Sequence, residues 1–409
     1  MIDVNKIRKD FPMLNDKKMQ GKTLVYFDNG ATSLKPQCVI DSIVDYYSNY
    51  TANAHRGDYD IAHRVDEKFD EVRTKVAKLI NCNSNEVVFT SGTSMSLNMV
   101  AYGYGEKYLH EGDEILITEA EHASNVLPWY NVAEKCKCKV SFIELDEDGR
   151  LNLDNLKQSL NSHVKIVSLA HVSNVLGYDF DVKSFAKEIH KIGAVFVLDG
   201  AQSVPHMSID VKDLDVDFLA FSGHKMCGPT GVGVLYGKYE LLDKMNPLLT
   251  GGGMNTKFDM CGNIGYQFPP LKFEAGTQNI AGVIGLGTAI DYLLKIGMDN
   301  ICQYEKELKE YAIEKLKQVP NVKIYNEKSN SAIITFNVLD VFAQDEATLL
   351  NSYGIAVRSG QHCAKILLNK LKTEATVRAS LYFYNTFEEI DTFVEALKKG
   401  GDFLDAYFN

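Results

Sequence analysis

Short apolar runs alternate with amphipathic stretches from about residue 23 to residue 241. The runs cover residues 86–90, 113–118, 164–170, 194–199, 216–222 and 231–237. Between the early runs, Val65, Phe69, Val72, Val76 and Leu79 recur at intervals of three and four, which indicates one buried helical face. Alternating strands and helices of this kind are typical of a mostly parallel sheet covered by helices. We therefore expect an open α/β sheet in this part of the chain.

The pattern changes after the motif GGGMN at residues 251–255. An irregular stretch to residue 276 is followed by predicted helices at 281–296 and 299–317 and by short strands near 322–324, 332–338 and 355–357. Thr386 and Glu389 have the spacing of a capping box that opens a last helix. We expect an N-terminal segment, residues 1–22, that packs near the small domain. A large domain at 23–284 and a smaller C-terminal α+β domain at 285–409 follow.

Composition narrows the class of ligand. The 409 residues carry a net charge of -11, which argues against the clustered Lys and Arg of sequence-independent nucleic-acid binding. No apolar run approaches the roughly 20 residues that cross a bilayer, and the first residues lack a signal-peptide core. The eight cysteines are scattered, so a disulfide framework is not expected. We expect a cytoplasmic protein with a small ligand and no nucleic-acid, membrane or metal partner.

Polar motifs follow the apolar runs, where an open α/β sheet binds its ligands. Lys225 in FSGHK stands at a predicted strand end, where a desolvated amine can form a Schiff base. Asp199 in VLDGAQS ends the preceding strand and could pair with a protonated pyridine ring. The hydroxyls of TSGTS precede a helix, whose free N–H groups can hold a phosphate. Each feature alone is explained by a surface charge or a cap, but together they indicate one cofactor site.

Ser222 and Lys225 also match the S-x-x-K pattern of acyl-serine enzymes, but the accompanying S-D-N and K-T-G motifs are absent. The full set of motifs resembles another group: the fold type I enzymes of pyridoxal 5'-phosphate, specifically the class V aminotransferase family and within it the Suf-type cysteine desulfurases. The motifs that carry the resemblance are YFDNGATSLKP, NAHRG, EHASN, HVSNVLG, DGAQSVPH, SGHKMCGPTGVGVLYG, FEAGTQN, RSGQHCA and VRASLYFYNTFEEID.

The resemblance implies roles around the cofactor. Lys225 bonds to the cofactor aldehyde, Asp199 pairs with the ring nitrogen, Gln202 approaches the ring oxygen, and His122 stacks on the ring and can carry a proton. Thr277 reaches the phosphate of the opposite subunit, so the resemblance implies a homodimer with a shared site. The phosphate ligands within one chain are Thr93, Ser94, Ser222 and His224.

The resemblance also implies the reaction. Cys363 in RSGQHCA takes the sulfur of L-cysteine as a persulfide, and L-alanine is released; a thiolate of this kind needs nearby positive charge or a base, and Arg358 and His362 are close in sequence. Arg378 is implied to clamp the substrate carboxylate, with a guanidinium fork suited to that group. The same pocket is expected to include Arg358, His55 and Asn174.

Two departures from the family pattern concern the surroundings of this chemistry. Ser94 stands where threonine is usual, and GGGMNT lacks the acidic residue common after the glycines, which affects how a partner docks. The loop of Cys363 is short, so we expect a sulfur acceptor or scaffold protein of iron–sulfur cluster assembly to approach it. The alternatives are a selenocysteine lyase, a plain class V aminotransferase and, from another class, a non-catalytic subunit that keeps the fold.

Overall fold

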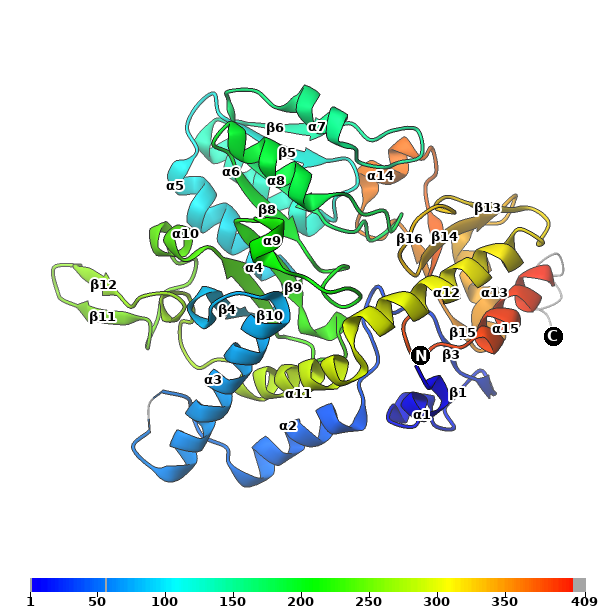
Figure 1. Cartoon of the computed structure of the whole chain (residues 1–409), viewed down its shortest axis with the longest axis horizontal. Coiled ribbons are helices and arrows are strands. Elements are labelled where there is room, and N and C mark those ends of the chain that lie inside the picture. The colour runs from blue at the N-terminus through cyan, green and yellow to red at the C-terminus, as the bar shows by residue number, and fades with distance from the viewer. Residues whose placement is uncertain (1, 56, 400–409) are drawn as a thin grey trace.

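The computed structural model describes residues 2–55 and 57–399. Its centre is a seven-stranded sheet in the order β4-β10-β9-β8-β7-β5-β6 (Figure 1). Strand β10 is antiparallel to both of its neighbours and the other pairs are parallel, so the expected mainly parallel sheet is confirmed. The strands are β4 (Val87–Thr90), β5 (Glu114–Thr118), β6 (Lys139–Ile143), β7 (Val164–Ala170), β8 (Val195–Asp199), β9 (Phe218–Ser222) and β10 (Gly233–Gly237).

Helices cover both faces of this sheet. Alternate strand side chains belong to different apolar clusters, as Leu116 and its neighbour Ile117 illustrate. One face packs against α3 (Asp60–Ile80), α8 (Val182–Lys191) and α11 (Ile280–Ile296), and the other against α4 (Thr93–Val100) and α6 (Leu127–Cys136). Shorter helices of this domain are α5 (Glu106–Tyr108), α7 (Leu153–Ser159), α9 (Val211–Leu214) and α10 (Tyr239–Lys244). Burial on both faces explains why β7 to β10 appear as nearly continuous apolar runs.

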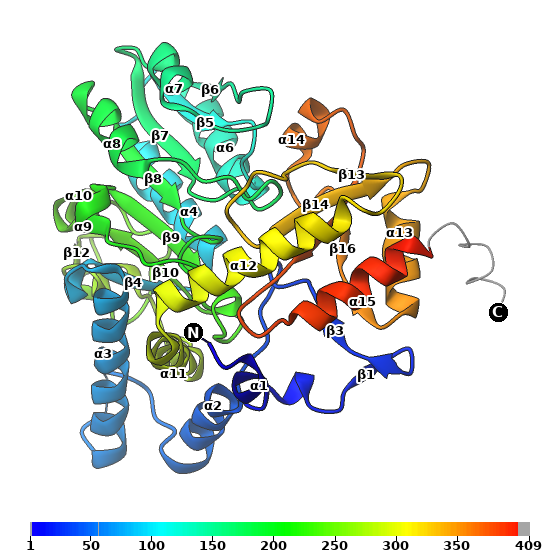
Figure 2. The same cartoon turned by 45° about the vertical axis from the view of Figure 1, so that its right-hand side comes forward.

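A second, antiparallel sheet forms the small domain, in the order β13-β14-β17-β16. Figure 2 shows α12 passing from the end of α11 to this sheet. The strands are β13 (Val322–Ile324), β14 (Ile333–Val338), β16 (Arg358–Gly360) and β17 (Thr376–Ser380). The helices are α12 (Met298–Leu316), α13 (Ala343–Ser352), α14 (Lys365–Lys370) and α15 (Phe387–Lys398). The predicted capping box of Thr386 and Glu389 opens α15.

The N-terminal part of the chain lies against the small domain. Strand β3 (Val25–Tyr26) pairs in parallel with β15 (Ile355–Ala356). Arg8, at the end of α1 (Val4–Arg8), donates to the Tyr384 carbonyl oxygen at 2.7 Å and pairs with Glu389 at 2.8 Å. A two-stranded hairpin of β1 (Lys18–Met19) and β2 (Lys22–Thr23) lies between these contacts along the chain. This segment therefore connects the first residues to the sheet that carries Arg358 and Arg378.

The predicted domain boundary after residue 284 needs correction, because it falls inside α11. Helix α11 packs along its length against α3 and against α2 (Gln37–Asn49), so all of it belongs to the large domain. The small domain begins near Met298, and its expected last residues, 400–409, lie outside the described part of the chain. In the described residues no single helix is both long and apolar enough to cross a membrane, and α11 and α12 satisfy that test only as a pair bent by 73°.

The stretch expected to be irregular contains a hairpin. Strands β11 (Asn255–Phe258) and β12 (Ile264–Tyr266) pair antiparallel and project from the large domain (Figure 1). Most of their side chains are exposed, so no alternation of buried and exposed positions marked them in the sequence.

Candidate active site

One cavity of about 300 Å³ lies where the carboxyl ends of the large sheet meet the small domain. Loops after β4, β5, β7, β8 and β9 contribute to its wall, and the small domain adds β16, β17 and the turn before α14. Twelve of the predicted site residues line it: Thr93, Ser94, His122, Asn174, Asp199, Gln202, Ser222, His224, Lys225, Arg358, Cys363 and Arg378. Residues that lie far apart in the sequence therefore meet at the carboxyl ends of the strands, as the sequence predicted.

The hydroxyl groups after β4 and β9 form one end of the cavity. Gly92 precedes α4 with a φ of 150°, and a Cβ there would meet the Ser222 hydroxyl oxygen at 3.3 Å. The Thr93 N–H donates to Ser222 Oγ at 2.8 Å, and the Thr93 and Ser222 hydroxyls are 2.7 Å apart. Ser94 Oγ contacts Ser124 Oγ at 2.6 Å. Free N–H groups and hydroxyls at the first turn of α4 make this a cradle for a phosphate.

Lys225 lies in the turn after β9, close to Asp199 at the end of β8. Burial lowers the pKa of the Lys225 ammonium to about 8; the Asp199 carboxylate opposes this and the Arg378 charge adds to it. Burial raises the pKa of Asp199, while an N–H donated by Ala201 at 2.9 Å works against the rise. The lysine is therefore partly neutral near neutral pH, as a nucleophilic amine must be.

His122 lies across the same cavity. Its Nδ1 accepts the N–H of Ser124 at 3.1 Å, so the ring proton of the neutral form is on Nε2. Burial first, and then the positive charges of Lys225 and Arg378, lower the pKa of His122 to about 4. A neutral imidazole that lines the cavity suits the expected stacking role.

Glu121, which our sequence analysis gave no role, lies beneath this wall and is buried. Its carboxyl group accepts the Thr118 hydroxyl at 2.6 Å, the Asn125 amide at 2.7 Å and the Ala170 N–H at 2.8 Å. Burial, with a smaller contribution from Asp199, raises the pKa of Glu121 to about 8. These bonds tie the ends of β5 and β7 together. The signal in the sequence that could have identified Glu121 was its position shortly after β5 and next to His122.

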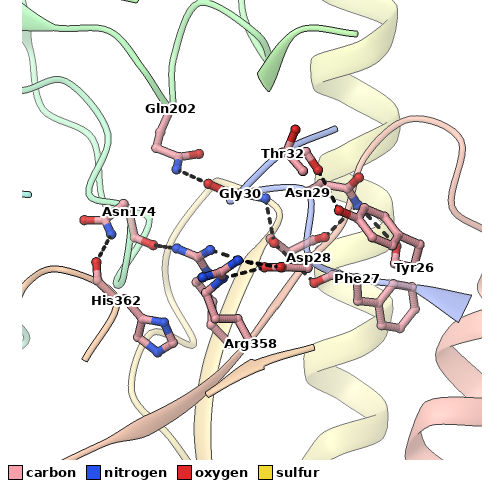
Figure 3. A network of polar contacts seen from close by, with 12 residues as sticks. Tyr26, Phe27, Asp28, Asn29, Gly30, Thr32, Asn174, Gln202, Arg358 and His362 are labelled. Atoms are coloured by element: carbon pink, nitrogen blue, oxygen red, sulfur yellow. Dashed lines mark hydrogen bonds and ion pairs between the residues drawn. The ribbon is translucent and has the colours of Figure 1, made fainter. Parts of the chain in front are cut away.

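Two arginines enter the cavity from the small sheet, where Arg358 on β16 is paired with Arg378 on β17. Arg378 has a side chain only 3% exposed and donates from Nη1 to the Asn174 carbonyl oxygen at 2.8 Å. Among the described residues its buried Nε has no hydrogen-bond partner. Asp28, absent from our predicted set, accepts two hydrogen bonds from Arg358 (Figure 3). It also lies 3.5 Å from Nη2 of Arg378.

The turn of Cys363 is short and tied at both ends. It connects β16 to α14, and both His362 and Cys363 have positive φ, 50° and 56°. The Cys363 carbonyl oxygen accepts the Ala123 N–H at 2.8 Å, and the His362 carbonyl oxygen accepts the Asn174 side-chain amide at 2.8 Å. Cys363 itself is exposed and lines the cavity. The loop is thus short and ordered, as expected.

His362 does not assist Cys363 in the way its sequence position suggested. Its ring is buried, with Nε2 2.9 Å from the Thr376 hydroxyl oxygen. Burial and the charge of Arg378 lower the pKa of His362 to about 3, so the ring is neutral. The positive charge near Cys363 comes from arginine side chains instead.

Two predicted residues lie outside this cavity. Thr277 is exposed and lines a different cavity of about 190 Å³, beyond β4, so its contact with an opposite subunit stays a prediction. His55 has a φ of 60°, and its Nδ1 lies 3.7 Å from Asp66. Its ring packs edge-on against Phe69, and it does not line the cavity within one chain, so its expected role in substrate binding stays a prediction.

The lining fits pyridoxal phosphate. A phosphate cradle stands at the first turn of α4, Lys225 and Asp199 lie deeper, and the Gln202 side chain donates to the Gly30 carbonyl oxygen at 2.8 Å. In the described part of the chain the buried Gln202 Oε1 and Arg378 Nε are left without partners. Such unpartnered polar atoms are uncommon in folded proteins and are expected where a polar ligand binds.

Comparison with known proteins agrees with this geometry. The family model described as aminotransferase class-V matches residues 25–393. A probable cysteine desulfurase of Halalkalibacterium halodurans is 43% identical over 410 residues, which is 100% of both chains. A probable cysteine desulfurase of Staphylococcus aureus is 44% identical and covers 99% of this chain and 98% of its own.

Solved structures give the same result. The cysteine desulfurase CsdA of Escherichia coli, in its S-sulfonic acid form, has a TM-score of 0.92 and 37% identity over 98% of this chain and 99% of its own. The cysteine desulfurase of Thermococcus onnurineus NA1 has a TM-score of 0.92 and 40% identity over 98% of each chain. The chain therefore belongs to the class V aminotransferase family. Within it, the protein is a cysteine desulfurase that depends on pyridoxal 5'-phosphate, which confirms the sequence prediction at this level.

Proposed function

We propose that the protein converts L-cysteine to L-alanine and keeps the sulfur as a persulfide on Cys363. The observation that carries this proposal is a single cavity lined by both the Lys225 amine and the Cys363 thiol. Pyridoxal phosphate, when bound, supplies the electron sink for the pair released at the substrate Cα. The remaining steps fall to side chains of this chain.

Arg378 orients the substrate. Its buried Nε is unpartnered among the described residues, and a carboxylate there gains a charge-assisted bond. Lys225, with a pKa lowered to about 8, is the base that removes the Cα proton and returns it. The neutral ring of His122 covers the reacting group from the opposite wall.

Cys363 then takes the sulfur. Its thiolate attacks the substrate sulfur atom, so an S–S bond forms while the substrate C–S bond breaks. The electron pair of the broken bond stays with the carbon, which gains a proton and leaves as the methyl group of alanine. No outside oxidant is needed, because the sulfur goes from one thiol to another and the carbon is reduced as the cysteine sulfur is oxidised.

Mass spectrometry of the holoenzyme after exposure to L-cysteine tests this directly. We expect one added sulfur atom on the peptide of Cys363 in the wild type. Cys363→Ala should lose alanine production from L-cysteine. Cys261→Ala is the matched control, since Cys261 is exposed too but lies in the turn between β11 and β12. Full alanine release by Cys363→Ala, or sulfur on another cysteine, would sink the proposal.

The same variant separates the alternatives. A selenocysteine lyase keeps its action on selenocysteine after Cys363→Ala, because selenium leaves more readily. A plain class V aminotransferase returns amino groups to a keto acid and ignores this substitution. A non-catalytic subunit leaves L-cysteine unchanged and is colourless after addition of pyridoxal phosphate.

We also propose that the enzyme acts as a homodimer with shared cofactor sites. Two features support this: Thr277 lies exposed on the loop before α11, and α2 exposes Val44 (56%) and Tyr47 (63%). An apolar helix face of this kind is typical of an interface. Sedimentation equilibrium at micromolar concentration should give twice the chain mass; a single-chain mass would contradict the proposal.

We further propose that the sulfur goes to an acceptor or scaffold protein of iron–sulfur cluster assembly, in a cytoplasmic Suf-type system. The support is the tied loop of Cys363: two backbone carbonyl bonds keep it from swinging outward, so the acceptor must come to the thiol. Alanine release should rise severalfold when the right acceptor is added. An unchanged rate with such acceptors present would count against it.

A further inference from the structure

The carbonyl oxygen of His224 accepts four hydrogen bonds from one segment of the chain. It belongs to the peptide group that joins His224 to Lys225, in the short turn after β9. The Ser33 N–H and the Thr32 hydroxyl each donate to it at 3.0 Å, and the Ser33 hydroxyl donates at 3.1 Å. The fourth donor is the Lys35 ammonium, also at 3.1 Å. A carbonyl oxygen has two lone pairs, so four donors exceed what the satisfaction of a buried group requires.

Lys35 uses all three of its N–H groups in this cluster. They donate to the Thr32 hydroxyl at 3.1 Å, to the Ser33 carbonyl oxygen and to the His224 carbonyl oxygen. These acceptors are uncharged, and burial lowers the pKa of the Lys35 ammonium to about 8. Burial of a charge against uncharged acceptors is costly, and proteins retain such costs chiefly at functional sites.

The same segment also holds the chain beyond Lys225. The Ser33 hydroxyl accepts the Cys227 N–H at 2.7 Å while it donates to His224. Bonds to one segment therefore hold the carbonyl before Lys225 and the N–H two residues after it. The backbone from which the Lys225 side chain extends is fixed from both sides.

The charge of Lys35 also acts on His224, which lines the cavity. Burial first, and then the charges of Lys225 and Lys35, lower the pKa of the His224 imidazole to about 4. Lys35 itself does not line the cavity, so any influence on the reaction must pass through the residues that it holds.

We propose that Lys35 is a positioning residue for the reaction: it holds the peptide group between His224 and Lys225 and so fixes the point from which the Lys225 amine reaches cofactor and substrate. The inference rests on the proposed function, because it takes Lys225 as the base. An amine that must bond to the cofactor, leave it and then remove a proton needs a fixed origin. A misplacement of about 1 Å can cost about a hundredfold in rate.

Kinetics of the holoenzyme with L-cysteine test this proposal. Lys35→Met keeps the unbranched shape and removes the donors, so kcat should fall about tenfold while KM changes less than about twofold. KM should be spared because Arg378, which orients the substrate, bonds to Asn174 instead. Thr32→Val removes one donor of the cluster and should lower kcat about threefold.

Lys272→Met is the matched control. Lys272 is a buried lysine whose ammonium donates to the Asp243 carbonyl oxygen at 2.7 Å, and it does not line the cavity. Its replacement should leave kcat within about twofold of the wild type.

A second measurement requires no turnover. The chain contains two His–Lys pairs, His190–Lys191 and His224–Lys225. Protein labelled with carbonyl-¹³C histidine and ¹⁵N lysine therefore gives one amide signal for each pair in an HNCO spectrum. Lys35→Met should shift the signal of His224–Lys225 and leave that of His190–Lys191 in place, with the cofactor bound or removed. Lys272→Met should move neither signal.

The outcomes separate positioning from other roles. A merely structural role for Lys35 would lower stability but leave kcat of the folded holoenzyme unchanged, and this result would overturn the proposal. An unshifted His224–Lys225 signal, or a rise in KM at constant kcat, would overturn it too. If Lys35→Met failed to fold, Thr32→Val would decide the matter by the same two measurements. Failure of the wild type to release alanine from L-cysteine would instead refute the proposed function, on which the signal shift does not depend.

Discussion

Replacement of Glu274 by glutamine should cost the protein about 3 kcal/mol of folding free energy. Glu274 forms a bidentate ion pair with Arg73 on α3, with both N–O distances at 2.8 Å. The Arg73 side chain is 6% exposed and the Glu274 side chain is 2% exposed. Glu274 also accepts the Phe89 N–H at 2.9 Å, and Arg73 donates to the Val87 carbonyl oxygen at 2.7 Å. This buried pair joins α3 and β4 to the loop that carries Thr277.

The magnitude follows from what the substitution leaves behind. Glutamine keeps the shape and one acceptor, but the Arg73 charge stays buried without a counterion, which costs about 3–5 kcal/mol in comparable pairs. The rings of Phe89 and Phe69, 4.6 and 5.5 Å from the guanidinium carbon, contact Arg73 in both proteins, so this attraction cancels in the comparison. The lower end of the range is expected because the glutamine oxygen still accepts a guanidinium N–H; the total stability of a protein is about 5–15 kcal/mol.

Urea unfolding followed by circular dichroism measures the loss. Lys75→Met is the matched control: Lys75 lies on α3, as Arg73 does, and the loss of its partly exposed pairs with Glu71 and with Asp291 on α11 should cost less than about 1 kcal/mol. Arg73→Met in the Glu274→Gln background should recover at least half of the loss, because it removes the uncompensated charge. Equal losses for Glu274→Gln and Lys75→Met, or no recovery in the double variant, would refute the reasoning.

Two other predictions concern a phosphate cradle and a charge cluster. Gly92→Ala should raise the dissociation constant of pyridoxal phosphate about tenfold, measured by cofactor release on dialysis, because a φ of 150° and the nearby Ser222 hydroxyl disfavour a side chain there; unchanged retention would contradict it. A hydrogen bond to Asp217 at 2.9 Å raises the pKa of His190. The protonated His190 therefore stabilises the folded protein below about pH 6.5, and this contribution is lost as pH rises through the raised pKa. His190→Gln should therefore cost about 1 kcal/mol near pH 6 and less near pH 9 in urea unfolding, and a cost that grows with pH would exclude this explanation.

The sequence predicts the strands that are buried on both faces. The run at 164–170 coincides with β7, where five of the seven positions are buried. Strand β6 was missed because it lies at the sheet edge with only Ile143 buried, so its apolar pattern is weak. The hairpin of β11 and β12 was missed for the same physical reason. An exposed strand has no buried face to mark it.

The site residues also fall into those that the sequence predicts and those that it misses. Residues that directly follow buried strands, such as Asp199 and Lys225, could be predicted because parallel strand ends share one edge. Asp28 could not, since its partners Arg358 and Arg378 approach it only through the pairing of β3 with β15 and of β16 with β17. The role expected for Thr277 involves a second chain, which a single sequence does not place.

One set of hydrogen bonds links the segments that carry Cys363, Arg378 and His122. The Asn174 side chain holds the His362 carbonyl oxygen, and the Asn174 carbonyl oxygen holds Arg378. Ala123, next to His122, donates to the Cys363 carbonyl oxygen. A shift of the Cys363 loop would therefore move His122 and Arg378 with it.

This coupling explains how the positive φ of His362 and Cys363 is maintained. Non-glycine residues in that region cost about 1–3 kcal/mol each, and they persist where surrounding contacts hold them. Here, the carbonyl oxygens of His362 and Cys363 accept bonds from Asn174 and Ala123, which hold the turn in one geometry at the cavity. On the proposed function, a thiol fixed in this way is well placed for attack on a bound sulfur and poorly placed to carry that sulfur outward, so we expect transfer at the mouth of the cavity.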